Sequence, residues 1–286
     1  MHLSDRLKLS DFPVGFEEDD KLRSDFVRRL TLDFIGCMPI ESDSHSAAIV
    51  STIPRTLVRY WHDANDVPDD VCACLDSWKK LRDEGFEILT FNDISATEYI
   101  KQHFGKRELA AFRRCRHPAM RSDYFRMCYI FDDGGFYVDA DDVMIGSLWR
   151  KLYADNRLKL QPLCYDIGSG TMLTTSQIWR ADLETNGRIF YVNNNPLIAP
   201  AGDAVVYRAL ERATKLLLAN DSPQEIQSTT GPGNLSAALV AYVRECELIG
   251  EQTGVELMKY WDDIAETRWE LSYRADSRNW RHMDRC

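Results

Sequence analysis

Three aspartates, Asp139, Asp141 and Asp142, end the segment GGFYVDADD at residues 134–142, directly after a short aromatic and β-branched run typical of a buried strand. Such crowding is unfavourable, because like charges repel and a desolvated carboxylate is costly unless a positive charge compensates it. In an extended chain Asp139 and Asp141 point to the same side, about 6–7 Å apart, and can share one bound ion. Carboxylate oxygens are ligands that Mg²⁺ and Mn²⁺ prefer. The spacing predicts a divalent-cation site with Asp141 and Asp139 as ligands, and a solvated acidic loop is the alternative.

A second pair of charged residues precedes the two glycines. Asp123 and Arg126 lie three residues apart in a segment with helical spacing, so they share one helix face. As a surface ion pair they would contribute little to stability. Beside a metal and a diphosphate, Arg supplies several fixed donors and Asp accepts from vicinal hydroxyls, which suits the binding of a sugar. We therefore expect Asp123 and Arg126 to act together with Asp139 and Asp141 in catalysis.

An alternation of strands and helices must position these residues. The hydrophobic pattern and the turn residues predict the following elements: strands at 53–61, 86–91, 136–138 and 188–192, and helices at 71–82, from Ser95 as N-cap, at 118–131 and at 204–218. Such alternation indicates a parallel sheet covered by helices, in which ligands bind beyond the carboxyl ends of the strands. The predicted fold class is therefore α/β.

The first 52 residues differ from this pattern. Apolar residues recur there at helical spacing, at Leu22, Phe26, Leu30 and Phe34. The polar stretch ESDSHSAA at 41–48 is predicted to be a linker. We therefore expect residues 1–52 to form a helical N-terminal accessory segment and residues 53–286 to form the main domain.

Composition excludes several classes of partner. The net charge is −10, from 35 basic and 45 acidic residues, which argues against nucleic acid or an anionic membrane as the main partner. The acidic N-terminus lacks the apolar core of a signal peptide, and no window approaches the roughly 18 apolar residues of a membrane span. The sequence thus predicts a cytoplasmic protein with no integral membrane span, any membrane contact being peripheral. The eight cysteines are scattered, which favours free thiols over a zinc site at Cys72/Cys74 or Cys115/His117.

Two motifs carry a resemblance to a known family. The block from Ala119 to Arg126 reads AMRSDYFR, and residues 134–141 read GGFYVDAD. Together they resemble the A-x-x-S-D-x-x-R helix and the G-G-x-Y-x-D-x-D signature of D-x-D glycosyltransferases of the capsular polysaccharide and initiating α-1,6-mannosyltransferase type (glycosyltransferase family 32-like, distantly similar to the catalytic domains of clostridial glucosylating toxins). The opening IPRTLVRYW at 53–61 also resembles the family's first strand. Residues 194–199 and Thr230-Gly231-Pro232 resemble the family more weakly.

This resemblance implies a Rossmann-like nucleotide-sugar-binding core of the GT-A type over residues 53–286. It implies a donor site in which Trp61 stacks on the base, and Ser122, Asp123 and Arg126 line the sugar pocket. Asn194 falls in the first of the more weakly similar segments and is expected at the same site. Asp139 would contact the ribose or a metal-bound water, and Asp141 would bind Mn²⁺ or Mg²⁺ directly. Tyr137 is expected to pack beneath the loop, and Asp142 to stand behind the ligands or face solvent.

The sequence departs from the family pattern in two places. Many members carry His in the first strand where this chain has Val58, and the family commonly ends its domain with a His and a Ser-Trp near the metal. Here the corresponding stretch runs from Ser277 through Trp280 to His282, with altered spacing. Either the tail closes the site differently, or the acceptor side has diverged, or Trp280 is a surface or core anchor.

These observations favour one function. We expect a retaining, metal-dependent glycosyltransferase that moves a hexose from a UDP- or GDP-linked sugar, with a UDP-sugar favoured, to a hydroxyl acceptor. The acceptor is a glycan, a lipid-linked intermediate, a protein or a small molecule. A catalytically degenerate sugar-nucleotide-binding module and a metal-dependent phosphohydrolase or nucleotidyltransferase are the alternatives.

Overall fold

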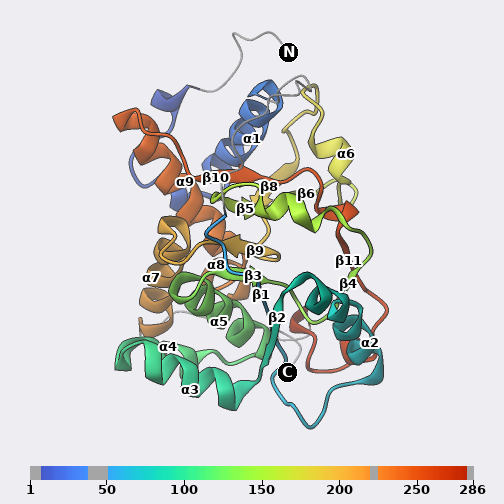
Figure 1. Ribbon diagram of the computed structural model, residues 1–286. Coiled ribbons are helices and arrows are strands. Elements are labelled where there is room, and N and C mark those ends of the chain that lie inside the picture. Colours follow the sequence, from blue (N-terminus) through green and yellow to red (C-terminus); the bar gives the residue numbers. More distant parts are fainter. Residues whose placement is uncertain (1–7, 38–50, 220–224, 282–286) are drawn as a thin grey trace.

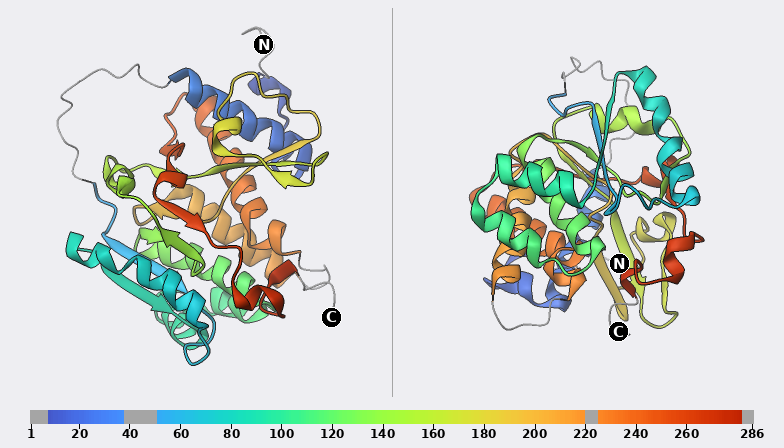
Figure 2. Two further views of the ribbon diagram at one scale, coloured as in Figure 1. Left: turned by 90° about the vertical axis from the view of Figure 1, so that its right-hand side faces the viewer. Right: turned by 90° about the horizontal axis from the view of Figure 1, so that it is seen from below.

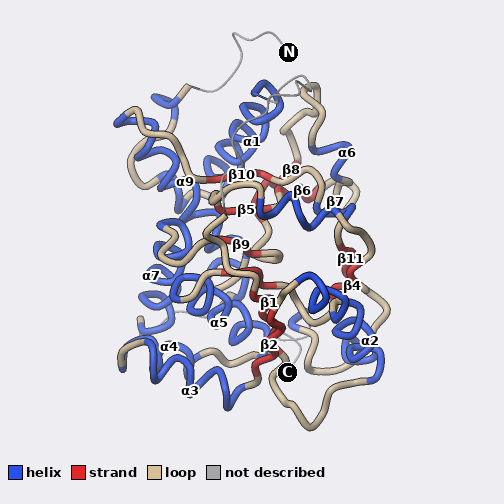
Figure 3. Tube along the Cα trace, in the orientation of Figure 1, coloured by secondary structure: helices blue, strands red, loops and turns tan. Residues whose placement is uncertain are grey.

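A six-stranded sheet runs through the middle of the protein, as the computed structural model shows for the described residues 8–37, 51–219 and 225–281 (Figures 1 and 3). In spatial order its strands are β2 (Glu87–Phe91), β1 (Thr56–Tyr60), β3 (Gly135–Tyr137), β9 (Leu197–Ala199), β5 (Leu158–Leu160) and β10 (Val255–Leu257). The pairs β1–β2, β1–β3 and β5–β10 are parallel, and only β9 runs antiparallel to its neighbours. The α/β class predicted from the sequence is confirmed.

Helices cover both faces of this sheet (Figure 2). The described helices are α1 (Asp20–Cys37), α2 (Asp69–Ser77), α3 (Asp93–His103), α4 (Lys106–Arg114), α5 (Pro118–Asp132), α6 (Thr175–Ile178), α7 (Ala204–Leu218), α8 (Ile226–Thr229) and α9 (Pro232–Ile249). On one face α7 packs against α4, α5 and α9. On the other face lie the short 3₁₀ turns at Lys79–Glu84, Leu148–Tyr153 and Trp261–Asp263. None of the described helices combines the length and the apolar composition needed to cross a bilayer, and the cytoplasmic location stays a prediction.

Side chains of the central strands alternate between two apolar cores. In β3, Phe136 faces the core beside α2 and Tyr137 faces the core beside α5. Leu57 and Val58 of β1 divide in the same way, and all four side chains have no exposed surface. Successive residues of a strand point to opposite faces, so a run without polar residues is buried on both sides. This explains why the strand that delivers the acids reads as continuously apolar.

The protein also contains two smaller sheets in its described residues. β4 (Asp142–Met144) pairs antiparallel with β11 (Ala265–Thr267). β6 (Pro162–Asp166) lies between β7 (Thr171–Met172) and β8 (Arg188–Val192). The strand predicted at 188–192 thus exists, but it belongs to this second sheet.

The two glycines before the acidic loop have no substitute. Gly134 has φ +70°, and an added Cβ would lie 2.5 Å from the backbone nitrogen of Ala201. Gly135 has φ +117°, and its Cβ would lie 2.9 Å from the carbonyl oxygen of Thr56 on β1. Backbone in this region is accessible to glycine at little cost. The glycines therefore let α5 end and β3 start directly alongside β1.

Two predicted helices differ in detail. The helix expected at 71–82 is α2 followed by a 3₁₀ turn at Lys79–Glu84. Trp78 and Leu81 point inward as predicted, and in a 3₁₀ turn residues three apart lie directly above one another. The helix expected from Ser95 begins earlier, because Asn92 is its N-cap and accepts hydrogen bonds from the backbone N–H groups of Ile94 and Ser95. Ser95 closes the capping box by accepting from the N–H of Asn92.

The N-terminal helix packs into the main body. Its helical spacing is confirmed by α1, which contacts β8 and α9. Phe26 and Leu30 of α1 belong to the same apolar core as α5 and α7. The domain boundary at residue 52 stays a prediction, and the predicted linker at 41–48 lies outside the described residues.

A buried lysine joins β5 to β10 and gives a testable result. Lys159 has no exposed surface, and its Nζ pairs with Asp155 and lies 3.0 Å from Glu256 Oε2. Burial alone would raise the pKa of Asp155, but hydrogen bonds from Arg157 and Lys159 outweigh it and lower that pKa to about 2. Because Asp155 is partly exposed, we expect Asp155→Asn to cost only about 1 kcal/mol of unfolding free energy at pH 7.

The sign of the pH dependence follows from the lowered pKa of Asp155. A carboxylate with a depressed folded-state pKa stabilises the fold above its unfolded pKa of about 4, and this contribution is lost as pH falls towards about 2. Urea unfolding of wild type and Asp155→Asn should therefore differ at pH 7 and converge at pH 2.5. The surface variant Asp76→Asn, an exposed acid paired with Lys79, is the control, and an undiminished difference at pH 2.5 contradicts the assignment.

Candidate active site

The predicted site residues meet at one edge of the central sheet. Because β1 and β3 are parallel neighbours, their carboxyl ends lie side by side, and they lead into Trp61 and Asp139 respectively. A cleft of about 690 Å³ opens there, within the size range of small-molecule sites. Its lining includes all the residues that the sequence analysis assigns to catalysis, donor binding or the metal: Trp61, Ser122, Asp123, Arg126, Asp139, Asp141 and Asn194.

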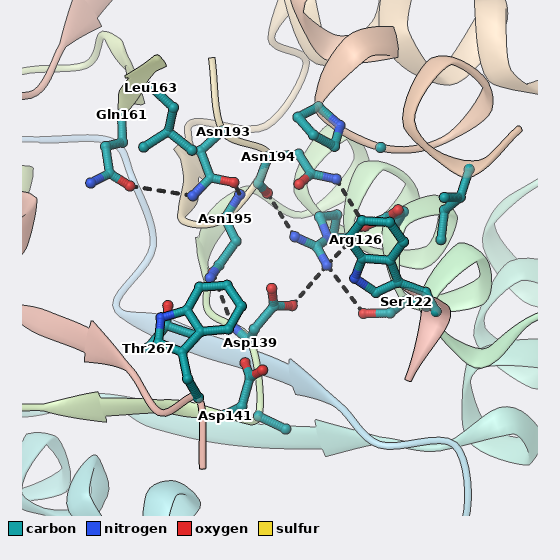
Figure 4. A pocket seen from close by; sticks show the side chains of 18 of the residues that line it. Ser122, Arg126, Asp139, Asp141, Gln161, Leu163, Asn193, Asn194, Asn195 and Thr267 are labelled. Carbon is teal, nitrogen blue, oxygen red and sulfur yellow. Dashed lines mark hydrogen bonds and ion pairs between the residues drawn. The ribbon is translucent and has the colours of Figure 1, made fainter. Parts of the chain in front are cut away.

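Arg126 is the centre of the polar network. The residue is 2 % exposed, and its guanidinium lies over the ring of Tyr137, 4.4 Å from the centroid. Nη2 donates to Asp139 Oδ1 at 2.7 Å and to Ser122 Oγ at 3.2 Å, and Nη1 donates to the carbonyl of Asn194 at 2.8 Å (Figure 4). A buried charge needs partners of this kind. Arg126 thereby fixes the acidic loop against α5.

Asp123 is held from three sides. Its Oδ1 lies 3.0 Å from Arg126 Nη2 and accepts a 2.8 Å hydrogen bond from Asn194 Nδ2. Its Oδ2 accepts from the Thr230 hydroxyl at 3.3 Å. Burial raises the pKa of Asp123, while Arg126 and these hydrogen bonds oppose the rise. Asn194 and Thr230, from the two segments that resemble the family only weakly, thus both donate hydrogen bonds to the Asp123 carboxylate.

Asn195 supports the acidic loop from the opposite side. Its Oδ1 accepts from the backbone N–H of Asp139 at 3.0 Å, and its Nδ2 donates to Asp142 Oδ2 at 2.7 Å. Asp142 Oδ1 accepts from the Thr267 hydroxyl at 2.6 Å, and the carboxylate is 1 % exposed. The option that Asp142 faces solvent is therefore wrong. Asn195 and Thr267 hold it inside, behind the other two acids.

The crowded acids shift one another's protonation. Burial, with Asp141 and Asp139 adding to it, raises the pKa of Asp142 to about 8. Burial also raises the pKa of Asp139 to about 6, Arg126 opposing the rise and Asp141 adding to it. Both raised pKa values favour the neutral form of the carboxyl group, because too little positive charge lies near the acids to offset their repulsion. A cation placed among the acids would reverse both shifts.

Asp141 is engaged by the C-terminal part of the chain. Its Oδ2 accepts a 2.7 Å hydrogen bond from the Tyr273 hydroxyl and forms an ion pair with Arg274 Nη2. Its backbone carbonyl accepts from the N–H of Arg268 at 2.8 Å. Neither Tyr273 nor Arg274 was predicted from the sequence, because no motif or charge pattern links them to residues so far upstream.

The donor set fits a divalent cation. In the described part of the chain, Oδ2 of Asp139 and Oδ1 of Asp141 accept no hydrogen bond and join no ion pair. Each acid thus keeps one carboxylate oxygen on the cleft side. Mg²⁺ and Mn²⁺ take one or two carboxylates and complete their shell with water and phosphate oxygens. Asp139 and Asp141 supply two carboxylates, the number that such coordination uses, and among the described residues no larger group of acidic, His or Cys side chains is placed to hold an ion.

Trp61 lies beside the acidic loop, because it follows β1 next to the end of β3 and packs in one apolar cluster with Ala140. Its indole Nε1 donates to the carbonyl of Asp66 at 2.9 Å, which fixes the ring, and the edge of Tyr273 packs against it with centroids 5.2 Å apart. Tyr137, predicted to pack beneath the loop, is buried and its hydroxyl lies 2.7 Å from Ser122 Oγ. The aromatic wall and the acidic loop thus face one cleft.

The C-terminal residues also reach the cleft. Trp280 lines it and packs against the main core, while Ser277 is exposed and its carbonyl accepts a 3.0 Å hydrogen bond from His117 Nε2. His117 in turn caps α5, since its Nδ1 accepts from the N–H of Ala119. His282 lies outside the described residues.

One comparison with known proteins covers the part of the chain that contains the acidic loop. Residues 68–159 match the sequence model of a family described as "Glycosyltransferase sugar-binding region containing DXD motif". The matched range contains α5 and the acidic loop, with Ser122, Asp123, Arg126, Asp139 and Asp141. This match confirms the enzyme class predicted from the sequence, a glycosyltransferase.

Two other comparisons add little detail. A solved structure described as "PaToxG Glycosyltransferase" aligns with 85 % of this chain and 91 % of its own, with a TM-score of 0.44 and 11 % sequence identity. A search of curated proteins gave no match.

Proposed function

We propose that the protein is a metal-dependent, retaining glycosyltransferase that transfers a hexose from a UDP- or GDP-linked sugar to a hydroxyl acceptor, with a UDP-sugar favoured. One observation carries this proposal. The Ser122, Asp123 and Arg126 block of α5 lies in one cleft with the two acids of the D-x-D motif and an aromatic wall at Trp61. The side chains proposed to bind the sugar, the cation and the base thus line the same cleft.

The proposal gives each side chain a role. Asp139 Oδ2 and Asp141 Oδ1 would hold Mn²⁺ or Mg²⁺, which would neutralise charge on the departing diphosphate. Arg126 keeps the Asp139 carboxylate oriented, and Asn195 holds the backbone of the same loop. Ser122 and Asn194 stand beside Asp123 at the sugar end. Preorganised charges of this kind act on the leaving group without reorganising during the reaction.

Retention at the anomeric carbon rests on the sequence resemblance. In such a reaction the leaving phosphate itself can take the acceptor's proton on the same face, so no separate base is required. The wider assignment to the capsular-sugar and mannosyltransferase type, with the GT-A type of donor site, rests on the same motifs. The acceptor, whether glycan, lipid-linked intermediate, protein or small molecule, is left open within the proposal.

One observation favours the alternative of a degenerate binding module. Asp141, the proposed metal ligand, already forms an ion pair with Arg274 Nη2. Turnover separates the two functions: we expect release of UDP or GDP from a panel of nucleotide sugars only when Mn²⁺ or Mg²⁺ is added. Metal-dependent nucleotide binding without release of the sugar would support the module. Phosphate release from the nucleotide would support the phosphohydrolase.

Trp61 provides a separate test of the base-stacking role. Stacking of a base on an aromatic ring is worth about 1–3 kcal/mol by alanine substitution. We therefore expect Trp61→Ala to weaken UDP or GDP binding about 10-fold to 100-fold, and Trp61→Phe to weaken it much less. Inorganic pyrophosphate has no base, so its affinity should not change. Titration calorimetry measures both ligands, and an equal loss for pyrophosphate would show a general disturbance of the cleft.

A further inference from the structure

The segment from residue 268 to residue 281 follows β11 (Figure 2, left, in red) and contributes Trp269, Tyr273 and Arg274 to the lining of the cleft. It is attached at both ends. The N–H of Arg268 donates to the carbonyl of Asp141, and the carbonyl of Ser277 accepts from His117 at the start of α5. Between these attachments, Tyr273 and Arg274 contact the Asp141 carboxylate. The segment therefore presents its side chains to the place where a diphosphate and a cation would meet.

Arg274 has more hydrogen-bonding capacity than the protein uses. Its side chain is 14 % exposed, and its Nε is buried without a hydrogen-bond partner in the described part of the chain. Among the described residues its only ion pair is the one from Nη2 to Asp141, and its guanidinium lies 4.5 Å from the ring centroid of Trp269. A guanidinium carries five N–H donors in a fixed fork that matches phosphate oxygens. An unpartnered buried donor is costly, so a ligand that satisfies it gains that energy.

A second guanidinium lies against the same indole. Arg281 is 5.1 Å from the Trp269 centroid and 5.5 Å from that of Trp280. Its side chain joins no ion pair and donates no hydrogen bond within the described residues. Two cations gathered around one ring repel each other, and aromatic contact offsets this by only about 1 kcal/mol at exposed sites. Both line the cleft, and together they suit an anion with two negative groups.

We propose that Arg274 and Arg281 form the binding site for the diphosphate of the nucleotide donor, and that Arg274 competes with the divalent cation for Asp141. The inference rests on the proposed function and deepens it. When the cation binds Asp141, the guanidinium of Arg274 is released towards the phosphates. When cation and nucleotide are absent, Arg274 neutralises the acid and Tyr273 holds the segment closed. Arg274 thus weakens binding of the metal when no nucleotide is present and strengthens binding of the nucleotide once the metal is bound.

Opposite effects of one substitution test this proposal. Titration calorimetry on Arg274→Ala should show Mn²⁺ alone binding about tenfold more tightly than to wild type, because a charged competitor is gone. In saturating Mn²⁺, UDP, GDP and inorganic pyrophosphate should each bind about tenfold more weakly to the variant. Arg281→Ala should weaken the diphosphates severalfold and leave Mn²⁺ alone unchanged. Arg268→Ala removes one charge from the same segment outside the cleft and should change neither affinity.

The proposal is overturned if Arg274→Ala leaves the affinity for Mn²⁺ or that for the diphosphates unchanged, or if no diphosphate binds wild type. If Arg274→Ala does not fold, as judged by circular dichroism, Arg274→Lys serves instead. That variant keeps the charge but loses the fork, so Mn²⁺ affinity should be kept and pyrophosphate affinity reduced. Should pyrophosphate binding depend on both arginines while no nucleotide sugar is turned over, the anion site stands and the proposed function fails.

Discussion

The Asp141→Asn protein is expected to fold and to lose metal-dependent binding of nucleoside diphosphate, and its kcat/KM for donor cleavage should fall at least about 10³-fold. Asparagine has the shape of aspartate but carries no charge, so it removes the ligand with little change in packing. The side chain faces the cleft, where water can solvate Arg274 after the ion pair is lost. Stability should therefore change far less than activity.

Asp141 is a cleaner target than Asp139. Asp139 also holds Arg126, so its substitution would mix a loss of binding with a loss of stability. Nucleotide affinity should be measured by titration with and without Mn²⁺, and turnover by release of UDP or GDP. Asp76→Asn on α2, an exposed acid paired with Lys79, removes the same charge elsewhere and should behave as wild type. If Asp141→Asn binds the nucleotide with Mn²⁺ as tightly as wild type does, Asp141 is not part of the site.

The sequence predicted the parts of the fold that local patterns determine. Apolar periodicity located α5 and α7, because one face of each helix must enter a core. The Gly134-Gly135 pair marked the end of α5 and the start of β3, since a Cβ at either position would collide with neighbouring backbone. The antiparallel β9 and the separate β6–β8 sheet were not predicted, because strand partners are chosen by contacts far apart in the chain.

The candidate site shows the same division. Asp139 and Asp141 could be predicted because both belong to one short motif, which starts with two glycines that let the backbone pass close to its neighbours. Asn195, which hydrogen-bonds to Asp139 and Asp142, lies in a segment that resembles the family only weakly, and the sequence assigned it no role. Arg274 follows Asp141 by 133 residues, and nothing in its local pattern distinguishes it from the other charges of the C-terminal segment. Such a pair is specified by the folded chain, not by spacing in the sequence.

Arg126→Met should cause a large loss of stability. The substitution keeps most of the side-chain volume but leaves Asp123 and Asp139 without their shared cation, in a region where Arg126 itself is 2 % exposed. Removing one partner of a buried ion pair typically costs about 3–5 kcal/mol. For a chain of this size that corresponds to a fall in Tm of about 10 °C. Arg121→Met on the same helix, whose partner Asp93 is more exposed, is the matched control and should cost clearly less.

The pH dependence of the Arg126→Met deficit distinguishes an electrostatic cause from a packing cause. In wild type, burial raises the pKa of Asp139 to about 6 although Arg126 opposes it, and without Arg126 that pKa must rise further. A carboxyl whose folded-state pKa is raised stabilises the fold below its unfolded pKa of about 4, and this contribution is lost as pH rises through the folded value. Because the variant's folded pKa is higher, it continues to lose stability above pH 6, where the contribution of Asp139 in wild type has already been lost. The stability difference measured by urea unfolding should therefore be largest at pH 8 and shrink towards pH 5, and adding Asp123→Asn should recover part of it. A difference that is the same at both pH values would mean that Arg126 contributes through packing on Tyr137, and that the acids do not need its charge.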